Sequence, residues 1–284
     1  MGGRAACLLA TAIMAAGLVV ASPPVAHAEI STECAAGTDT ASVNRLITNQ
    51  LADLVGFDTT RVIALPDGRK VWTVQDAFLA PSPGVRPSSL RPPTGFAHNA
   101  LIVQEGSCFT TVHGPITPGS QCSVADASYV GADLTAPCSR WFWPMSGGLD
   151  HLGRLVVFYV EMFNERGSGA ASTARPIATW MARFDSATFD ILSFAPAPAP
   201  AADIVYGAAV ESDASFSYLF GWSYDQFNLP DPTSPPPSQM FVARVPVGRF
   251  DQQPAYWNGV GWVSTHAAAV PISTTPTGAS NPMQ

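Results

Sequence analysis

The sequence predicts an all-β protein assembled from β-propeller blades. The segment Gly68–Asp76 aligns without gaps on residues 153–161, and a weaker third copy covers residues 215–223. Short strands that recur with turn signals between them are typical of propellers, and no convincing amphipathic helix follows Leu54. A plain β-sandwich is the alternative architecture.

The first repeat begins with a hairpin. Strand Arg61–Leu65 and strand Lys70–Val74 are joined by Pro66-Asp67-Gly68, in which Pro presets φ and Gly accepts a positive φ. The strands expected after each repeat copy are residues 98–104, 179–184 and 240–245, and a third blade is expected to close near residues 257–263. Three blades can therefore be counted, and an incomplete ring would leave sheet edges open.

The rest of the chain divides around this repeat region. We expect a secretory signal peptide over residues 1–28, a poorly regular lead-in over 29–55 and an irregular tail over 266–284. The propeller domain itself is expected over residues 56–265. A short helix is expected over residues 43–54, within the lead-in.

The first residues have the pattern of an export signal. A lone Arg4 precedes the apolar stretch Ala5–Val20, and Ala26-His27-Ala28 ends the segment. We expect cleavage before Glu29, with a retained anchor as the alternative. No other stretch approaches the ~20 apolar residues of a membrane span, so the mature chain is expected to be secreted or held in the cell envelope without a span.

The remaining composition narrows the partners. A formal net charge of −7 argues against nucleic acid. The cysteine and histidine spacings match no zinc pattern, so we expect neither a metal nor another cofactor. We also expect a monomer.

Four cysteines remain after the expected cleavage, and in an exported chain they predict two disulfides. Sequence alone allows three pairings of Cys34, Cys108, Cys122 and Cys138. We favour Cys122 with Cys138, and Cys34 with Cys108, which would tie down the N-terminus.

Two aspartates bracket the first hairpin. Asp58 precedes its first strand and Asp76 ends its second, so the antiparallel pairing should bring them together at the end opposite the turn. Two neighbouring carboxylates in a secreted all-β protein suggest cleavage of a glycosidic bond. Asp before a strand is also common as a plain turn residue, which is the alternative interpretation.

Certain motifs resemble a known family. The runs Gly56-Phe57-Asp58-Thr59, Leu65–Arg69, Val71–Phe78 and Trp143–Gly148 resemble the secreted endo-D-arabinanases of mycobacteria and their relatives. The resemblance implies a five-bladed propeller that cuts the D-arabinan of arabinogalactan and lipoarabinomannan with retention of configuration. It implies Asp76 as nucleophile and Asp58 as general acid/base. Against that family, we expect the chain to lack the last one or two blades.

Further candidates would contact the sugar. Trp143 is the best aromatic wall, because the loop Pro144–Gly148 after it resembles the approach to a pocket. His98 and Asn99 are candidates for hydrogen bonding to the substrate, although a histidine at a strand start is more often a solvated turn residue. The aromatic faces on offer are Trp72, Phe78, Trp141, Trp143, Tyr206 and Trp222, of which Tyr206 joins the predicted substrate-binding set.

Glu161 is the remaining substrate-binding candidate. It occupies in the second repeat the position of Asp76 in the first, so a propeller axis would direct it toward the same cleft. The alternative is an edge carboxylate paired with Arg154 or Arg166.

Two other functions stay open at this point. A catalytically inactive propeller could bind wall glycan or protein, and would have no need for two carboxylates within ~5.5 Å of each other. A hydrolase acting on another furanoside, such as L-arabinan or fructan, would share the architecture and the acids.

Overall fold

The computed structural model describes residues 28–49, 53–79, 95–114, 130, 140–163, 175–198, 204–223 and 239–274. Apart from Ala28, the predicted signal peptide lies outside these residues, and so do Cys122 and Cys138. Within the described ranges, no helix is both long enough and apolar enough to cross a membrane.

The described chain is nearly all-β. Its single α-helix, α1, spans Thr40–Asn49, and a 3-10 turn, η4, spans His266–Ala268. The strands are β1 Glu29–Cys34, β2 Leu54–Gly56, β3 Thr60–Ala64, β4 Lys70–Leu79, β5 Phe96–Glu105, β6 Cys108–His113, β7 Arg140–Leu149, β8 Leu155–Phe163, β9 Arg175–Phe184, β10 Ile191–Pro196, β11 Ile204–Ser212, β12 Phe216–Ser223, β13 Gln239–Pro246, β14 Ala255–Trp257, β15 Trp262–Val263 and β16 Ser273–Thr274.

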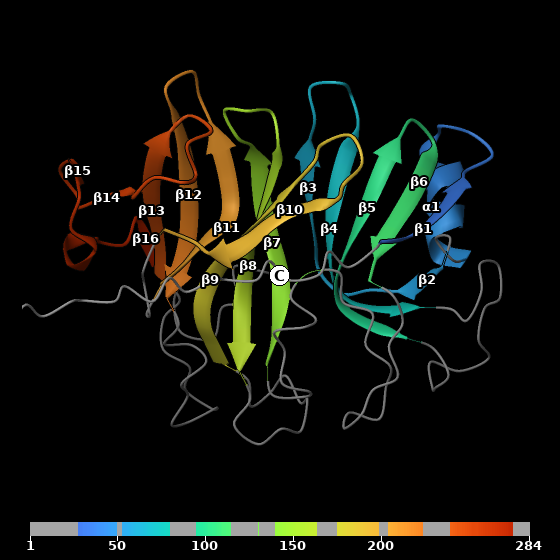
Figure 1. The fold of residues 1–284 in the computed structure, drawn as a ribbon, viewed down its shortest axis with the longest axis horizontal. Helices are drawn as coiled ribbons and strands as arrows, with labels where there is room; N and C mark the ends of the chain where they lie inside the picture. Colours follow the sequence, from blue (N-terminus) through green and yellow to red (C-terminus); the bar gives the residue numbers. More distant parts are fainter. Residues whose placement is uncertain are drawn as a thin grey trace, which may run out of the picture.

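The strands of the described residues form three antiparallel sheets. The first has the order β1-β6-β5-β4-β2 with β3 also paired to β4, the second β10-β9-β8-β7, and the third β11-β12-β13-β14-β15 with β16 paired to β13. They lie side by side in chain order, and their curled strands make a half-barrel (Figure 1). Short turns join β3 to β4, β5 to β6, β7 to β8, β9 to β10 and β11 to β12, and each of these pairs is antiparallel.

The predicted repeat corresponds to equivalent strands. Its three copies cover β4, β8 and β12, each of which lies between two partners of its own sheet. The strands expected after the copies are β5, β9 and β13, so these secondary-structure predictions are confirmed. The closure of a ring and the number of blades are not shown, and the propeller stays a prediction.

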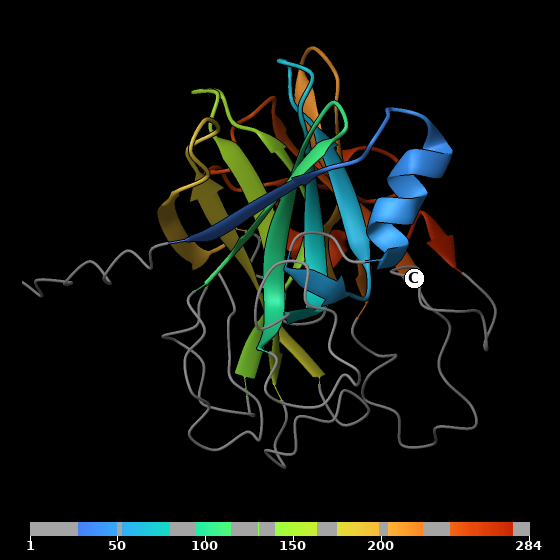
Figure 2. The same cartoon turned by 90° about the vertical axis from the view of Figure 1, so that its right-hand side faces the viewer.

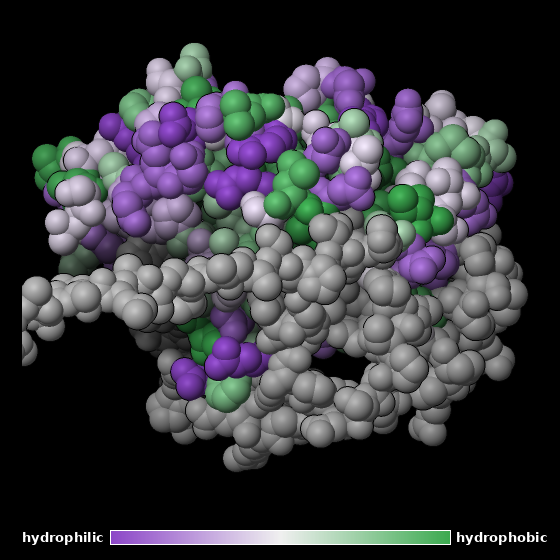
Figure 3. All heavy atoms as spheres, in the orientation of Figure 1, coloured by the Kyte–Doolittle hydropathy of each residue, from purple (hydrophilic) through white to green (hydrophobic). Residues whose placement is uncertain are grey.

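Apolar side chains fill the spaces between sheets. Val71 of the first sheet and Leu155 of the second are fully buried in one cluster. Val160 of the second sheet and Ala243 of the third are fully buried in another. Hydrophilic and hydrophobic residues are interspersed over the described part of one molecular face (Figure 3). Because these two clusters join residues of different sheets, burial of apolar side chains between the sheets holds them together.

The N-terminal segment is more regular than predicted. Residues 29–34 form β1, which pairs along its whole length with β6 at the edge of the first sheet (Figure 2). The expected helix over residues 43–54 is displaced: α1 begins at Thr40, because Asp39 caps it by accepting hydrogen bonds from Ser42 N and Ser42 Oγ at 3.0 and 2.7 Å. Leu54 belongs to β2, where it pairs with β4.

The start of the predicted tail also has structure. Residues 266–268 form η4, and β16 pairs with β13 through Ser273 and Thr274. The expectation of an irregular tail is therefore wrong for these residues, because backbone pairing to a sheet edge does not require an apolar pattern. Residues 275–284 lie outside the described part of the chain.

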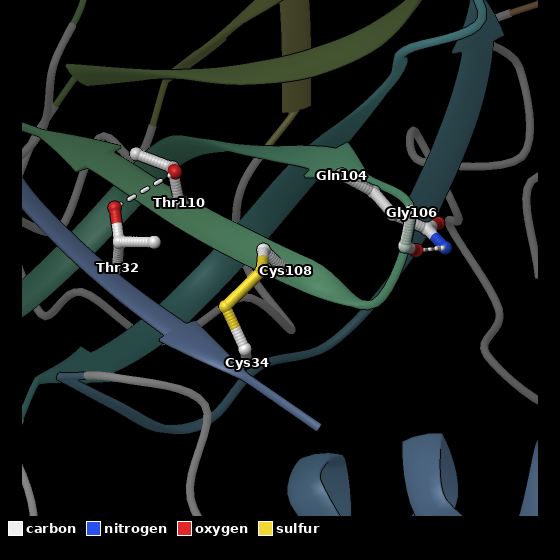
Figure 4. The surroundings of a disulfide bond; sticks show 6 residues. All are labelled: Thr32, Cys34, Gln104, Gly106, Cys108 and Thr110. Atoms are coloured by element: carbon white, nitrogen blue, oxygen red, sulfur yellow. Dashed lines mark hydrogen bonds between the residues drawn. A yellow bond between two sulfur atoms is a disulfide. The ribbon is translucent and has the colours of Figure 1, made fainter. Parts of the chain in front are cut away.

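One disulfide joins Cys34 and Cys108, which confirms that predicted pair. The two residues are direct partners in the β1–β6 register, with a Cα–Cα distance of 3.9 Å (Figure 4). Two residues away, the hydroxyls of Thr32 and Thr110 share a hydrogen bond of 2.9 Å. The bond closes a loop with a sequence separation of 74, so it removes much chain entropy from the unfolded state.

A buried ion pair attaches the segment before β2 to β6. His113 Nε2 lies 2.7 Å from Asp53 Oδ2, and its Nδ1 lies 2.7 Å from the Gly114 carbonyl oxygen. Burial opposes the charge on the imidazole, but the hydrogen bonds to Asp53 and Gly114 outweigh it and raise the pKa of His113. Burial likewise opposes ionisation of Asp53, but the bonds from His113 and Thr111 outweigh it and lower the pKa of Asp53. Both ring nitrogens face acceptors, so the imidazole carries both protons.

We expect the disulfide to stabilise the fold. Replacing Cys34 and Cys108 together with alanine should lower the free energy of unfolding by about 2–4 kcal/mol, because a long loop is released. Urea unfolding of the wild type and the double variant measures this difference. Equal free energies of unfolding would contradict the prediction.

The Asp53–His113 pair should make stability depend on pH. The raised pKa of His113 adds stability below its unfolded value of about 6.5, and this is lost as the pH rises through the folded value. The lowered pKa of Asp53 adds stability above its unfolded value of about 3.9, and this is lost as the pH falls through the folded value. The pair should therefore contribute most between about pH 4 and pH 6.5.

His113→Leu should lower the free energy of unfolding by on the order of 3 kcal/mol at about pH 5, because it leaves the largely buried Asp53 carboxylate without its cationic partner. The loss should shrink in alkaline solution. Urea unfolding across this pH range measures it, with exposed His151→Leu as the control. A loss that stays constant at high pH would refute the pairing argument.

Candidate active site

The first hairpin has the geometry that its turn residues predict. Leu65 N donates to the Arg69 carbonyl at 2.8 Å, and Gly68 has a φ of 91°, a conformation that favours glycine. Thr60 pairs with Val74 at the other end of the ladder. Residues just before β3 are therefore carried to the part of β4 that contains Asp76.

Asp58 lies beside that part of β4. Its N–H donates to the Gln75 carbonyl at 3.0 Å, and Gln75 N–H donates to the Thr59 carbonyl at 3.1 Å. Asp58 and Thr59 thus both oppose Gln75, as two residues oppose one in a β-bulge. Asp58 is exposed and receives a long hydrogen bond of 3.5 Å from the Thr59 hydroxyl. Its backbone is next to the residue that precedes Asp76.

Asp76 has an unusual backbone for a residue within a strand. Its φ is 45°, in the left-handed region, and its neighbours Gln75 and Ala77 pair with β5 on either side. Asp tolerates this region better than most residues, but the conformation still costs of order 1 kcal/mol. Strain of this kind is concentrated at functional sites, which makes Asp76 the first candidate here.

Two donors converge on one oxygen of Asp76. Trp143 Nε1 of β7 donates to Oδ1 at 2.8 Å, and His98 Nδ1 of β5 lies 3.0 Å from the same atom. The side chains of Asp76 and His98 are 25% and 24% exposed, so the carboxylate is packed on one side and accessible on the other. Two sheets contribute to this one group.

Aromatic rings support both donors. His98 stacks on Trp141 at 5.1 Å with an interplanar angle of 18°, and it also meets the edge of Phe96 at 4.8 Å. Trp141 is fully buried and meets Trp143 edge to face at 5.7 Å. The donors therefore have little freedom to leave the carboxylate.

Three buried polar side chains of the first sheet hold β7 in place. Their acceptors are three carbonyl oxygens of β7 that flank Trp143, and we call this set the inter-sheet clamp. Thr73 Oγ1 donates to Met145 at 2.8 Å, Gln75 Nε2 to Pro144 at 2.8 Å and Asn99 Nδ2 to Phe142 at 3.0 Å.

The clamp coincides with an irregularity in β7. The β7–β8 register shifts between Pro144 and Gly147, and a Cβ at Gly147 would collide with the Val156 carbonyl oxygen. Glycine is required there because the two backbones approach so closely. The predicted loop Pro144–Gly148 is thus part of a bulged strand, since side chains of another sheet satisfy its carbonyls.

The side chain of Asn99 makes its hydrogen bonds inside the protein. It is buried, its Nδ2 also donates to the Val130 carbonyl at 3.0 Å, and its Oδ1 accepts from Val130 N at 2.7 Å. Both ends of the amide are engaged inside the protein. The structure does not bring this side chain to the Asp76 carboxylate.

Glu161 is on the other side of β7 from Trp143. It pairs directly with Phe142, and alternation puts Phe142 and Trp143 on opposite faces. Its Oε1 pairs with Arg140 at 3.1 Å and its Oε2 accepts from Trp180 Nε1 at 2.7 Å. The structure does not bring it to Asp76, and its cation is neither of the two arginines considered from the sequence.

Tyr206 is also away from the site. It is fully buried in the cluster between the second and third sheets, beside Tyr256 at 5.7 Å between ring centroids. Of the predicted site residues, the structure therefore groups Asp76, His98 and Trp143, and it places the backbone of Asp58 beside Gln75. Among the described residues, no set of three or more potential ligands could hold a metal ion.

The sequence analysis missed the clamp and the support from Trp141. Val71, Thr73 and Gln75 are two residues apart along β4 and therefore lie on the same face of the strand, and all three are buried. Polar residues at buried positions of an apolar strand are the signal that could have revealed the clamp, because such groups need hydrogen-bond partners. Their partners in β7 could not be read from the strand itself.

The fold and the site define an all-β protein that carries two aspartates at the open end of a hairpin, one of them fastened to a second sheet. The chain belongs to the family described as "Domain of unknown function (DUF5005)", which matches residues 41–281. No curated protein matches the sequence.

A solved structure has a similar fold. The crystal structure of "a putative hydrolase" from Bacteroides ovatus superposes with a TM-score of 0.56 at 14% sequence identity. The match covers 84% of this chain and 59% of the Bacteroides chain, so this protein spans little more than half of that one. Identity at this level shows the fold alone.

The clamp should be necessary for stability and for the position of Trp143. Gln75→Leu should lower the free energy of unfolding by about 1–3 kcal/mol, because the Pro144 carbonyl loses its partner in a buried place. Urea unfolding followed by tryptophan fluorescence measures both effects. Gln104→Leu is the matched control, since Gln104 is less buried and bonds Trp72 Nε1 at 3.1 Å, away from β7. An equal loss in both variants would speak against a special role of the clamp.

Proposed function

We propose that this protein is a secreted glycoside hydrolase that cleaves D-arabinofuranosyl linkages of cell-wall arabinan with retention of configuration. The observation that carries the proposal is the aspartate pair: Asp76 is held by two donors, and the backbone of the exposed Asp58 bonds Gln75, the residue before Asp76. A retaining hydrolase needs two such carboxyl groups ~5 to 5.5 Å apart.

Three further observations support the proposal. The motifs around both aspartates resemble those of secreted endo-D-arabinanases, and the Bacteroides protein of similar fold is described as "a putative hydrolase". The disulfide is compatible with an oxidising, extracellular location. Three consecutive antiparallel sheets are also compatible with blades of a propeller domain over residues 56–265, preceded by a cleaved signal peptide.

The roles follow from the surroundings of the two groups. Hydrogen bonds from N–H donors stabilise a charged carboxylate, so Asp76 is assigned as the nucleophile. Asp58 is solvent-exposed and can exchange protons with water, so it is assigned as the acid that protonates the leaving oxygen and later the base that activates water.

The test is incubation of the purified protein with arabinogalactan, followed by analysis of the released oligosaccharides. Asp76→Asn should abolish cleavage while the protein stays folded, because the amide cannot attack the anomeric carbon. Asp58→Asn should slow arabinan cleavage by about 10²- to 10⁴-fold and affect an activated aryl arabinofuranoside much less, because a good leaving group needs little protonation.

Asp67→Asn is the matched control. Asp67 is exposed in the hairpin turn and pairs with Arg69, so its loss should leave turnover unchanged. Undiminished arabinan cleavage by Asp76→Asn would remove Asp76 from the mechanism. Binding of arabinan without any cleavage by the wild type would favour a glycan-binding protein instead.

A further inference from the structure

We propose that Oδ2 of Asp76 is the reacting atom, and that His98 and Trp143 are positioning residues that hold Oδ1 rather than groups that contact the sugar. This inference rests on the proposed function. It reverses the roles that the sequence suggested for both residues, because Nδ1 of His98 and Nε1 of Trp143 are directed at a carboxylate of the protein.

The two oxygens of Asp76 have different surroundings. Oδ1 receives the indole N–H of Trp143 at 2.8 Å and faces His98 Nδ1 at 3.0 Å. Within the part of the chain that the structure describes, Oδ2 accepts no hydrogen bond. An indole nitrogen can only donate, so Oδ1 is an acceptor, and His98 Nδ1 therefore carries a proton.

This asymmetry selects one oxygen for attack. Two donors withdraw electron density from Oδ1, which leaves Oδ2 as the more nucleophilic atom. In the glycosylation step, Oδ2 forms a bond to the anomeric carbon while the bond from that carbon to the leaving oxygen breaks, and the leaving oxygen takes the proton of Asp58. Oδ1 then becomes the carbonyl oxygen of the ester and keeps its two donors.

The same donors assist the second step. Water attacks the anomeric carbon, loses its proton to Asp58, and the bond to Oδ2 breaks so that the electron pair returns to the carboxylate of Asp76. Negative charge develops on that carboxylate, and preorganised donors stabilise developing charge without rearrangement. His98 and Trp143 can therefore lower the barrier of this second step without touching the sugar, and in the first step they hold the carboxylate in position for attack.

Both donors are held from behind. Trp143 lies in β7 between the carbonyls of Phe142 and Pro144, which the inter-sheet clamp holds. The ring of His98 is stacked on buried Trp141. The left-handed backbone of Asp76 completes the arrangement, because it turns the carboxylate toward these donors at a conformational cost. Three elements thus fix one oxygen.

Matched variants separate the donor from the ring. His98→Asn places an amide N–H near the position of Nδ1 and loses the ring, whereas His98→Phe keeps a ring for stacking and loses the donor. Trp143→Phe likewise keeps an aromatic ring and loses the donor. The controls are Trp72→Phe, whose Nε1 bonds Gln104 elsewhere in the first sheet, and His151→Phe in an exposed turn.

A positioning role predicts a fall in kcat with little change in KM. On arabinan, His98→Phe and Trp143→Phe should each lose about 10- to 100-fold in kcat, the effect of one hydrogen bond to a charged group. KM should stay within about twofold, and His98→Asn should recover most of the lost kcat. Circular dichroism and thermal unfolding of every variant check that the fold is retained.

The outcomes are distinct. A raised KM with unchanged kcat in His98→Phe or Trp143→Phe would make these residues sugar-binding groups and overturn the inference while the proposed function stands. His98→Asn performing no better than His98→Phe would also overturn it. If the wild type cleaves neither arabinan nor aryl arabinofuranosides, it is the proposed function that fails.

A spectroscopic measurement tests the geometry without catalysis. Nitrogen NMR of the His98 ring should show a proton on Nδ1 in the wild type, and Asp76→Ala should shift that resonance because the acceptor is gone. A wild-type ring protonated on Nε2 alone would overturn the inference whatever the activity.

Discussion

The site depends on how the second sheet is attached to the first. Packing of apolar side chains brings sheets together, but it tolerates small sliding movements because it has no direction. The inter-sheet clamp is directional: Thr73, Gln75 and Asn99 each bond a particular carbonyl of β7. Hydrogen bonds in a buried place are costly to break, so the register between the two sheets is fixed.

The bulge in β7 provides the carbonyl groups that attach the second sheet to the first. The bulge at Pro144 and Gly147 disturbs the β7–β8 ladder, and neighbouring carbonyls are taken up by the first sheet. Pro144 has no N–H to contribute to a ladder, and Gly147 allows the close approach to Val156. An irregularity that would weaken an isolated sheet thus becomes the joint between two sheets.

The predictions from sequence succeeded where local chemistry decides the structure. The hairpin and its turn follow from Pro66 and Gly68, whose backbone preferences need no partner elsewhere. The proximity of Asp58 to the end of β4 then follows from antiparallel pairing. The Cys34–Cys108 pair was the favoured prediction for these two cysteines, and the bond can form because Cys34 of β1 lies directly opposite Cys108 of β6.

The predictions failed where a side chain's direction depends on packing. Glu161 was aligned with Asp76 through the repeat, but the positive φ of Asp76 changes the direction of that side chain, and Glu161 has no such backbone change. Tyr206 was predicted for its aromatic face and Asn99 for its amide, yet both side chains are buried. A repeat transfers position along a strand. It does not predict the face of the sheet on which a side chain lies when a bulge interrupts the strand.

The pairing of β1 with β6 has a consequence for solubility. Without β1, the backbone N–H and C=O groups of β6 would form an open edge, and open edges are where chains add to one another. The Cys34–Cys108 bond lies at the end of this pairing, next to the turn that joins β5 and β6. In a reducing compartment the edge would be covered only by hydrogen bonds. After oxidation the cover is covalent, so β1 stays tethered to β6 even when the hydrogen bonds between them open.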